Sequence, residues 1–338
     1  MNEKVTSNDV AKKAGVSQAT VSRVINNYSF VRESTREKVL QAIEEMGFTP
    51  DQVARSLNMR KTGTIGLIVG DISNPFFSET AKVIIGEARE SGFDVIISDT
   101  DHSDQNLGKA IQTLIGKRVD GMLIGSVGRF DTNVQQLVDK RFPLVMYNTR
   151  LDRDDCNYVV INNVKGARVA MKHLLDLGHQ KIAYISGNTK YSTLYDRLNG
   201  YHETIKKQGL PFRQDYVYDG ELTVAGLQRF LQTPWQDEER PTAFFASNDQ
   251  IALLLMEAAL SLGIRVPEDI SIIGFDNISY SAKPFIQLTT VSQQHRRMAS
   301  LALEKLIQLM NTDDKTLKVS ANLEPEIIVR NTSAALEQ

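Results

Sequence analysis

Eight short β-rich apolar runs recur along the chain beyond Thr64, and each is followed by a stretch of helical character. The runs are IGLIVG (65–70), DVIISD (94–99), GMLIGS (121–126), LVMYN (144–148), YVVIN (158–162), IAYISG (182–187), TAFFAS (242–247) and ISIIGFD (270–276). Runs of this length alternating with helices indicate βαβ units and buried parallel sheets. So many strands predict a two-lobed α/β body, with ligands bound at the carboxyl ends of the strands.

Polar and aromatic residues stand where several of these runs end. They are Asp71, Ser73, Asn74, Phe76 and Phe77 after the first run, Ser126 at the end of the third, Asn148 and Arg150 after the fourth, Arg197 in a later helix, Asn248 and Asp249 after TAFFAS, and Asp276. Aromatic faces combined with Asn, Asp and Arg favour a small polar ligand in a cleft. Each residue has a simpler interpretation, because an Asp at a strand end is more often a helix cap and Phe76–Phe77 could be core. The recurrence at several strand ends favours the ligand site.

The first 48 residues predict three short helices. Thr6 and Asp9 form a capping box before the first, and Gly15 ends it. Ser17 is expected to cap the second, with Val21, Val24 and Ile25 facing inward. The third is expected to begin at Ser34, where Ser34-x-x-Glu37 matches a capping box, to bury Val39, Leu40, Ile43 and Met46, and to end at Gly47. Two short helices joined around a glycine form a helix-turn-helix.

The second helix of such a unit presents its exposed residues to the major groove of DNA. Here these are Ser17, Gln18, Ala19, Ser22 and Arg23. Gln pairs well with adenine, Arg with guanine, and Ala contacts the thymine methyl. A protein-binding module of three amphipathic helices would show the same periodicity, and the base-reading chemistry of the exposed face argues against it.

The charge distribution agrees with a DNA-binding front end. Residues 1–61 hold ten Lys/Arg against seven Asp/Glu, whereas the whole chain carries a formal net charge of −2. The lone Cys156 excludes an internal disulfide. We find no catalytic motif, and the five His residues (102, 173, 179, 202 and 295) are scattered through predicted loops and helices as expected surface or cap residues. We therefore expect no metal, no cofactor and no enzyme activity.

The N-terminal text DVAKKAGVSQATVSRVIN, followed by VRESTREKVLQAIEEMGFTPDQVARSL, resembles the headpiece of the lac repressor/galactose repressor (LacI/GalR) family. The resemblance implies DNA contacts from Thr6, Ser17, Gln18, Ala19, Thr20, Ser22, Arg23 and Asn26. It also implies a hinge helix at 51–57 that folds in the minor groove, with Arg55, Ser56 and Leu57 at the DNA and Leu57 wedged between base pairs. From the residues alone, a plain linker with Leu57 packed locally is equally acceptable.

The body resembles the family's effector domain, which is similar to periplasmic sugar-binding proteins. The matching segments are DISNPFFSE, GKRVDGMLI, HLLDLGHQKIAYISG, FFASNDQIAL, RVPEDISIIGFDN and LTTVSQ. By this resemblance Arg197, Asn248 and Asp276 bind sugar hydroxyls, Phe76–Phe77 stack on the ligand, and Gln293 lies in the cleft. Asn148 stands where many members have Asp, and Leu222 where others have an aromatic residue, which puts the identity of the ligand in doubt.

The expected organisation is an all-α helix-turn-helix headpiece (1–48), a hinge helix and linker (49–63), and a two-lobed α/β periplasmic-binding-protein-like effector and dimerisation domain with parallel sheets (64–338). The first lobe is expected at about 64–160 and 293–320, and the second at about 161–292 and 321–332. The resemblance implies three crossovers, with a helix from about 295 to 310 returning to the first lobe.

The expected partners are double-stranded DNA with a palindromic operator, a second copy of the chain, and a small effector, most simply a sugar. One recognition helix reads a half-site, so a homodimer is expected; after Arg330 there is no leucine heptad for a tetramer. No apolar stretch resembles a signal peptide or a membrane span, so a cytoplasmic protein is expected. A catabolite-control regulator with a protein or phosphometabolite co-repressor is an alternative. A transport-type sugar-binding protein would have no use for residues 1–58.

Overall fold

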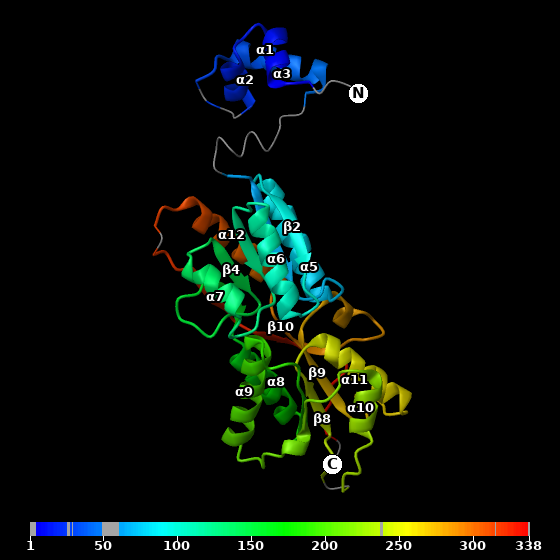
Figure 1. Ribbon diagram of the computed structural model, residues 1–338. Helices are drawn as coiled ribbons and strands as arrows, with labels where there is room; N and C mark the ends of the chain where they lie inside the picture. Colours follow the sequence, from blue (N-terminus) through cyan, green and yellow to red (C-terminus); the bar gives the residue numbers. More distant parts are fainter. Residues whose placement is uncertain are drawn as a thin grey trace. The chain divides into compact units, whose positions relative to one another are not determined.

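The computed structural model describes residues 5–25, 28, 30–48, 61–236, 239–314 and 316–336. The chain divides into two compact units, Met1–Thr62 and Gly63–Gln338, which are called the headpiece and the body below. Figure 1 shows both units and labels their elements.

The headpiece contains α1 (Ser7–Ala14), α2 (Gln18–Ile25) and α3 (Glu33–Met46). The predicted capping box is present, because the Thr6 side chain accepts from the backbone of Asp9 while the Asp9 carboxylate accepts from the Thr6 backbone N–H. Gly15 and Gly47 end α1 and α3 in left-handed conformations that favour glycine. The three helices enclose a small core that includes Val10, Val21 and Val39.

The start of α3 differs from the prediction. α3 begins at Glu33 with Arg32 as its N-cap, and no side chain caps it. The backbone N–H of Thr35 donates to the Arg32 carbonyl, so Ser34 already lies inside the first turn and cannot serve as its cap. Leu40 was expected in the core, but half of its surface is exposed and Ala42 is buried instead. The expected capping box at Ser34 and the expected burial of Leu40 are therefore wrong.

The first lobe of the body is built on a six-stranded sheet in the order β11-β5-β4-β3-β1-β2. The strands are β1 (Thr64–Val69), β2 (Asp94–Asp99), β3 (Gly121–Ile124), β4 (Leu144–Tyr147), β5 (Tyr158–Ile161) and β11 (Ser320–Leu323). All of their pairings are parallel. Helices α5 (Pro75–Glu90) and α12 (His295–Asn311) contribute to the core on one face, and α6 (Asp104–Gly116) and α7 (Thr132–Asp139) to the core on the other.

The second lobe has a six-stranded sheet in the order β12-β10-β9-β8-β6-β7. Its strands are β6 (Ile182–Ile185), β7 (Val217–Tyr218), β8 (Ala243–Ala246), β9 (Ser271–Asp276), β10 (Thr289–Ser292) and β12 (Glu326–Ile328). β12 alone runs antiparallel to its neighbour among these pairings. Helices α8 (Asn163–Asp176) and α9 (Ser192–Lys207) cover one face, and α10 (Val224–Leu231) and α11 (Asp249–Ser261) cover the other. Short 3-10 turns, η1 (Gln214–Tyr216) and η3 (Ser279–Ala282), complete the lobe.

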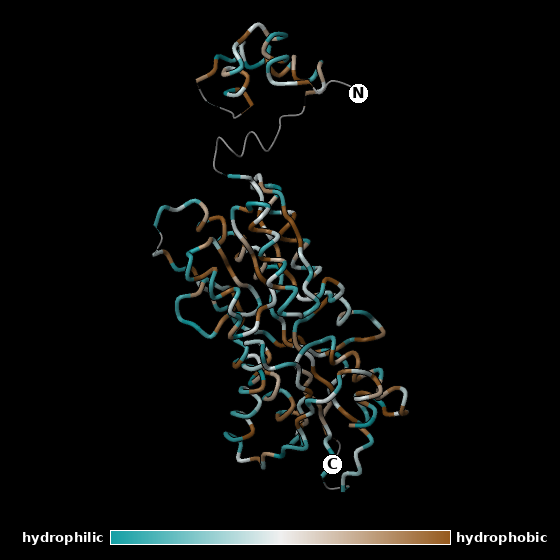
Figure 2. The backbone as a smooth tube through the Cα atoms, in the orientation of Figure 1, coloured by the Kyte–Doolittle hydropathy of each residue, from teal (hydrophilic) through white to brown (hydrophobic). Residues whose placement is uncertain are grey.

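All eight apolar runs identified in the sequence are strands, and the inner ones are fully buried. Figure 2 shows hydrophobic segments along the inner strands of the body and hydrophilic segments along its outer helices and loops. Burial on both faces explains why these runs are continuously apolar instead of alternating.

The chain passes between the lobes three times: between β5 and α8, between β10 and α12, and between β11 and β12. The expected return to the second lobe at about 321 differs from the structure, because β11 pairs with β5 in the first sheet through Leu323. The short polar strand SANL lacks the apolar run that marked the other strands.

Candidate functional site

α2 and the residue before it expose four of the five residues that the sequence singled out for reading DNA. Ser17 caps the helix, since its hydroxyl accepts from the backbone N–H of Thr20 at 3.2 Å. Gln18, Ala19 and Arg23 are exposed on the side of the helix away from the buried Val21 and Val24, whereas Thr20 and Ser22 are half-buried. Thr6 is exposed and acts as the N-cap of α1. A short polar helix end with an exposed guanidinium and amide is suited to hydrogen bonding with base edges.

Four of the predicted DNA-binding positions lie outside the described residues: Asn26, Arg55, Ser56 and Leu57. The hinge helix expected at 51–57 lies there too, so it stays a prediction.

A cavity of about 410 Å³ lies in the body where loops from the two lobes meet. Ten of the predicted effector-binding residues line it: Asn74, Phe76, Phe77, Ser126, Asn148, Arg197, Leu222, Asn248, Asp276 and Gln293. They come from the ends of β1, β3, β4, β7, β8, β9 and β10 and from α9. Parallel strands bring their carboxyl ends to one edge of each sheet, which is why residues so distant in the sequence meet here.

Two predicted residues are not among those that line the cavity. The Asp71 carboxylate accepts from the backbone N–H and the hydroxyl of Ser73, and so fixes the turn before α5. Arg150 points to Asp196 and Asp152, with nitrogen–oxygen distances of 3.7 and 4.0 Å. Both residues shape loops beside the cavity.

A buried ion pair forms the floor of the cavity in the second lobe. Arg197 Nη1 lies 3.3 Å from Asp276 Oδ1, and its Nε donates to Asn163 at 2.9 Å. The guanidinium carbon also lies over the Phe275 ring, 3.6 Å from its centroid. Burial raises the pKa of Asp276 to about 7, against the opposing effect of Arg197.

Two polar atoms at this floor are buried and have no hydrogen-bond partner among the described residues. They are Arg197 Nη2, a donor, and Gln293 Oε1, an acceptor; the Gln293 amide donates to Asp276 Oδ1 at 2.5 Å. Buried polar groups in native proteins are nearly always paired, so these atoms are the natural contacts for a ligand that carries both donors and acceptors.

The first lobe contributes an aromatic wall. Phe76 and Phe77 pack edge to face in the first turn of α5, with ring centroids 5.3 Å apart, and both are almost fully buried. Asn74 caps this helix and its amide donates to Gln250 of the second lobe at 3.1 Å. Asn248 caps α11 in the same way. The two asparagines thus serve as caps and line the cavity at once.

His102 belongs to this wall of the cavity and is exposed, as expected of a surface residue. Its ring lies 6.1 Å from Phe77 and 5.6 Å from Tyr191, and its Nδ1 is 3.3 Å from the Ser126 hydroxyl. A Cβ at Gly70 would fall 2.4 Å from this ring, so the imidazole can pack over the end of β1 because Gly70 has no side chain. His179, in contrast, is buried, which overturns its expected role as a surface residue, and it is hydrogen-bonded to Thr242 and Ser271.

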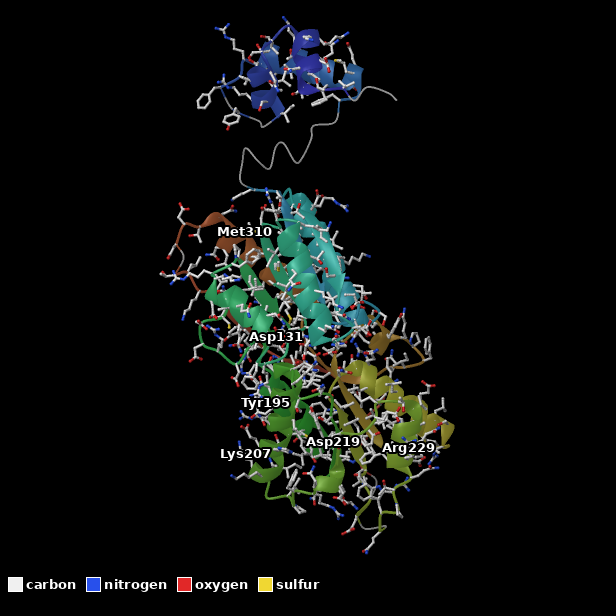
Figure 3. All side chains as sticks on the ribbon, viewed as in Figure 1. Asp131, Tyr195, Lys207, Asp219, Arg229 and Met310 are labelled. Carbon is white, nitrogen blue, oxygen red and sulfur yellow. The ribbon has the colours of Figure 1, made fainter. Side chains whose placement is uncertain are left out.

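The loop after β6 spans the cavity and was missed by the sequence reasoning. Lys190 Nζ reaches the His102 carbonyl at 3.1 Å and Asp104 at 3.0 Å, and the Tyr191 hydroxyl donates to the same carbonyl. Beside it, Arg129 of the first lobe lies 3.6 Å from the ring centroid of Tyr195 on α9. Figure 3 labels Tyr195 and, across from it in the first lobe, Asp131, the N-cap of α7. Ligand residues were expected directly after the apolar runs. The same expectation, extended to the residues that follow IAYISG, would have included Lys190 and Tyr191.

Within the described ranges, no group of three or more His, Cys, Asp or Glu is placed to hold a metal ion. No helix in the same part of the chain is long and apolar enough to cross a membrane.

Both the headpiece and the body are similar to known proteins. Residues 6–51 match the model for bacterial regulatory proteins of the lacI family, and residues 171–333 match the periplasmic binding protein-like domain. The transcriptional repressor PurR of Vibrio vulnificus is 35% identical over 331 residues, which cover 97% of this chain and 98% of the relative. Catabolite control protein A of Priestia megaterium is 34% identical over 310 residues, or 91% and 93% of the two chains.

Among solved structures, the lac repressor dimer bound to operator and the anti-inducer ONPF has a TM-score of 0.86 at 28% identity. The match covers 98% of this chain and all of that one. The helix-turn-helix, the two-lobed body and relatives matched over nearly their full length agree with one another. The chain therefore belongs to the lacI family of bacterial regulatory proteins and is a DNA-binding transcriptional regulator.

Proposed function

We propose that this protein is a homodimeric, cytoplasmic repressor of sugar-utilisation genes, whose operator affinity is set by an uncharged sugar or sugar derivative in the cavity between the lobes. The observation that carries the proposal is the balance of charge in the cavity. The lining cations are Lys190 and Arg197, and each has a carboxylate partner, Asp104 and Asp276 respectively. A phosphate or carboxylate ligand would have to compete for cations that are already paired.

The uncharged character of the cavity agrees with a polyhydroxyl ligand. Arg197 Nη2 and Gln293 Oε1 offer one donor and one acceptor, and Asp276 offers a carboxylate. The Phe76 ring provides the apolar face that a sugar ring needs on one side. Asn148 and Asn248 at the cavity rim add amide groups that can both donate and accept. We propose that the ligand is bound and released without being transformed, because the matched relatives are regulators.

For the DNA side, we propose that Gln18, Ala19 and Arg23 read base edges while Thr6, Ser17, Thr20 and Ser22 position α2. Asn26, Arg55 and Ser56 complete the contact set, and Leu57 is proposed as the minor-groove wedge. Replacing Leu57 with Ala should reduce operator bending, measured by the separation of two fluorophores at the duplex ends. Unchanged bending would assign residues 51–57 to a plain linker.

The proposal of a homodimer is supported by exposed apolar side chains on the body. In the first lobe, Ile97 is exposed on the edge strand β2, which packs beside α5. In the second lobe, Leu260 at the end of α11 and Phe285 are 78% and 84% exposed. Soluble proteins tend to cover large apolar groups in an interface. Light scattering should give twice the 37.8 kDa of one chain; a mass of four chains would contradict the proposal.

A thermal-shift screen of sugars, sugar phosphates and nucleobases tests the effector. A ligand present at 100 times its Kd adds about 2.7 kcal/mol of stability, which is readily detected. We expect an uncharged sugar to shift the melting temperature, and the Asp276→Asn variant to lose that shift. A response confined to phosphorylated compounds or purines would overturn the assignment. A regulator that responds to none of them, but binds operator tightly with a partner protein, would fit the catabolite-control alternative.

A further inference from the structure

A chain of hydrogen bonds runs along the floor of the cavity between the lobes, which is called the effector cavity below, and joins two of the three crossovers. It begins at Asn163, the first residue of α8, whose side-chain amide donates to the carbonyl of Ile161 at the end of β5, at 3.1 Å. It ends at Gln293, the residue that follows β10 at the second crossover. Arg197 and Asp276 lie between these ends. We call the four side chains and the Ile161 carbonyl the crossover chain.

Each link of the crossover chain is a direct contact between two groups. Asn163 Oδ1 accepts from Arg197 Nε at 2.9 Å, and Arg197 Nη1 lies 3.3 Å from Asp276 Oδ1. The same Asp276 oxygen accepts from the Gln293 amide at 2.5 Å. All four residues are buried, and hydrogen bonds in such surroundings are stronger than in water. The two crossovers are therefore connected through the residues that form the cavity floor.

Asn163 has neither of the simpler roles expected of an asparagine at this place. The cap of α8 is Asn162, whose Oδ1 accepts from the backbone N–H of Lys165 at 3.0 Å. Asn163 is also not among the described residues that line the effector cavity. Its amide oxygen holds Arg197 and its amide nitrogen holds the first crossover. The side chain thus links the guanidinium at the floor to the polypeptide that passes between the lobes.

The helix that carries Arg197 is packed closely against the start of α8. Gly200 lies one turn after Arg197 on α9, and a Cβ at Gly200 would fall 2.6 Å from the carbonyl oxygen of Val164 on α8. The backbones of the two helices are therefore in contact beside Asn163, and α9 cannot approach α8 further. A ligand that binds Arg197 acts on the bonds of its guanidinium, one of which belongs to Asn163.

The third crossover is bound to the other two. The backbone N–H of Asn162 donates to the carbonyl of Leu323 at the end of β11, at 2.9 Å. The side chain of Gln294, next to Gln293, donates to the Glu324 carbonyl at 2.7 Å. A displacement at either end of the crossover chain therefore reaches all three connections between the lobes.

We propose that Asn163 is a positioning residue for the effector response, which ties Arg197 to the first crossover and so makes closure of the lobes depend on the state of the cavity floor. This inference rests on the proposed function only in that an effector occupies the cavity, and it holds for any ligand that contacts Arg197 or Gln293. It predicts that the two ends of the crossover chain act as one unit. Breaking the chain at either end should loosen the lobes, and breaking it at both ends should loosen them no further.

Hydrogen exchange on the full-length, ligand-free protein reports how often the lobes open. The reporters are two amides that donate from the first lobe to the second. The amide of Arg129 donates to the Lys190 carbonyl, and the amide of Arg150 donates to the Ser192 hydroxyl. None of these four residues belongs to the crossover chain, so a change in their exchange reflects the arrangement of the lobes.

A double-mutant cycle with Asn163→Ala and Gln293→Ala tests whether the two ends act together. Each single variant should raise both exchange rates about three- to ten-fold, as expected for the loss of one hydrogen bond. The double variant should match the faster single variant, because the chain is already broken. Asn163→Asp keeps an acceptor for Arg197 but has no amide to donate to Ile161, so it should raise the rates as Asn163→Ala does.

The matched control is Asn157→Ala, which removes a half-buried asparagine whose Oδ1 accepts from the backbone N–H of Val319 inside the first lobe, at 2.9 Å. It should leave both exchange rates unchanged. Melting curves establish which variants are folded. If Asn163→Ala does not fold, Asn163→Asp takes its place in the cycle.

Three results would overturn the proposal. The first is a double variant in which the two single effects multiply, because the ends would then act independently. The second is wild-type exchange in the Asn163 variants, and the third is an equal acceleration by Asn157→Ala. No sugar enters this experiment. A failed sugar screen therefore leaves the crossover chain standing, and a failed cycle leaves the sugar proposal standing.

Discussion

Lys190 joins the two lobes, since its Nζ lies 3.0 Å from Asp104 Oδ1 on the far side of the effector cavity. The same ammonium donates to the His102 carbonyl, so one side chain of the second lobe contacts both the loop after β2 and the start of α6. The lobes are also connected by the covalent crossovers and by other non-covalent contacts, such as those of Asn74 with Gln250 and of Arg129 with Tyr195. Unlike the crossovers, the Lys190 contact can break and re-form. The Lys190 loop is therefore a place where closure of the lobes can be adjusted.

Replacing Lys190 with Ala should loosen the closed arrangement. Partly exposed ion pairs contribute about 0–1 kcal/mol, so local opening should become up to about five-fold more frequent. Hydrogen exchange is the measurement: the amide of Arg129 donates to the Lys190 carbonyl and should exchange faster in the variant. Lys172→Ala is the control, because Lys172 pairs with Asp176 inside α8. Equal exchange in the two variants would show that Lys190 does not hold the lobes together.

The raised pKa of Asp276 predicts a particular dependence of stability on pH. Its carboxyl loses its proton near pH 7 in the folded chain and near pH 4 in the unfolded chain. Between these values the folded state holds the extra proton, so this group stabilises the fold most below pH 4, and its contribution declines as the pH rises to 7.

Asp276→Asn removes this titration. The free energy of unfolding of the wild type minus that of the variant should fall by up to about 1.4 kcal/mol per pH unit between pH 4 and 7. Above pH 7 this difference should not change with pH. Urea unfolding at a series of pH values measures the difference. A difference that rises with pH would mean that the pKa of Asp276 is lowered by Arg197 more than burial raises it.

Gly70→Ala should destabilise the body, because the new Cβ would overlap the His102 ring. Overpacking of a close contact typically costs about 1–3 kcal/mol. Thermal unfolding measures the loss. Gly116→Ala is the matched control: nothing lies within 4 Å of its Cβ at the end of α6, so it should be neutral or slightly stabilising. If both variants are equally stable, the His102 ring moves aside at no cost and does not shape the cavity wall.

Arg23→Ala should relax the preference for one base pair in the operator half-site. A good bidentate contact from Arg to guanine discriminates by about 1–3 kcal/mol. Selection of bound duplexes from a random pool, carried out with the wild type and the variant, compares their sequence logos. Lys12→Ala on α1 is the control, and it should leave the logo unchanged. If Arg23→Ala weakens binding to all duplexes equally, Arg23 contacts phosphate and not a base.

Local sequence was sufficient to place most of the described elements of this protein. The continuous apolar runs located eight strands, because burial on both faces removes the polar residues that would otherwise alternate. Thr6 with Asp9 and the two glycines, Gly15 and Gly47, located helix ends, since caps act within a single turn. Seven residues selected at the ends of the apolar runs line the effector cavity, whereas Arg197 was selected from a helix, and Leu222 and Gln293 only by the family resemblance.

The same local reasoning failed where a contact depends on a second segment. Ser34-x-x-Glu37 matches a capping box, yet α3 starts one residue earlier and leaves Ser34 inside its first turn. β11 has no apolar run, and it is a strand because β5 offers it an open edge. Asp71 and Arg150 follow strands as the cavity residues do, but Asp71 is bound to Ser73 in its own turn and Arg150 to Asp196 on α9.

The sequence by itself therefore determined the headpiece helices, the strands and the chemical character of the effector cavity. Tertiary structure alone decided that Arg197 meets Asp276, that His102 lies over Gly70, and that Lys190 reaches Asp104. The physical reason is the separation in sequence of the residues that interact. Apolar periodicity and caps are fixed by residues within one or two turns, whereas these three contacts join loops and helices that become neighbours only when the strands have been ordered in their sheets and the two lobes have closed.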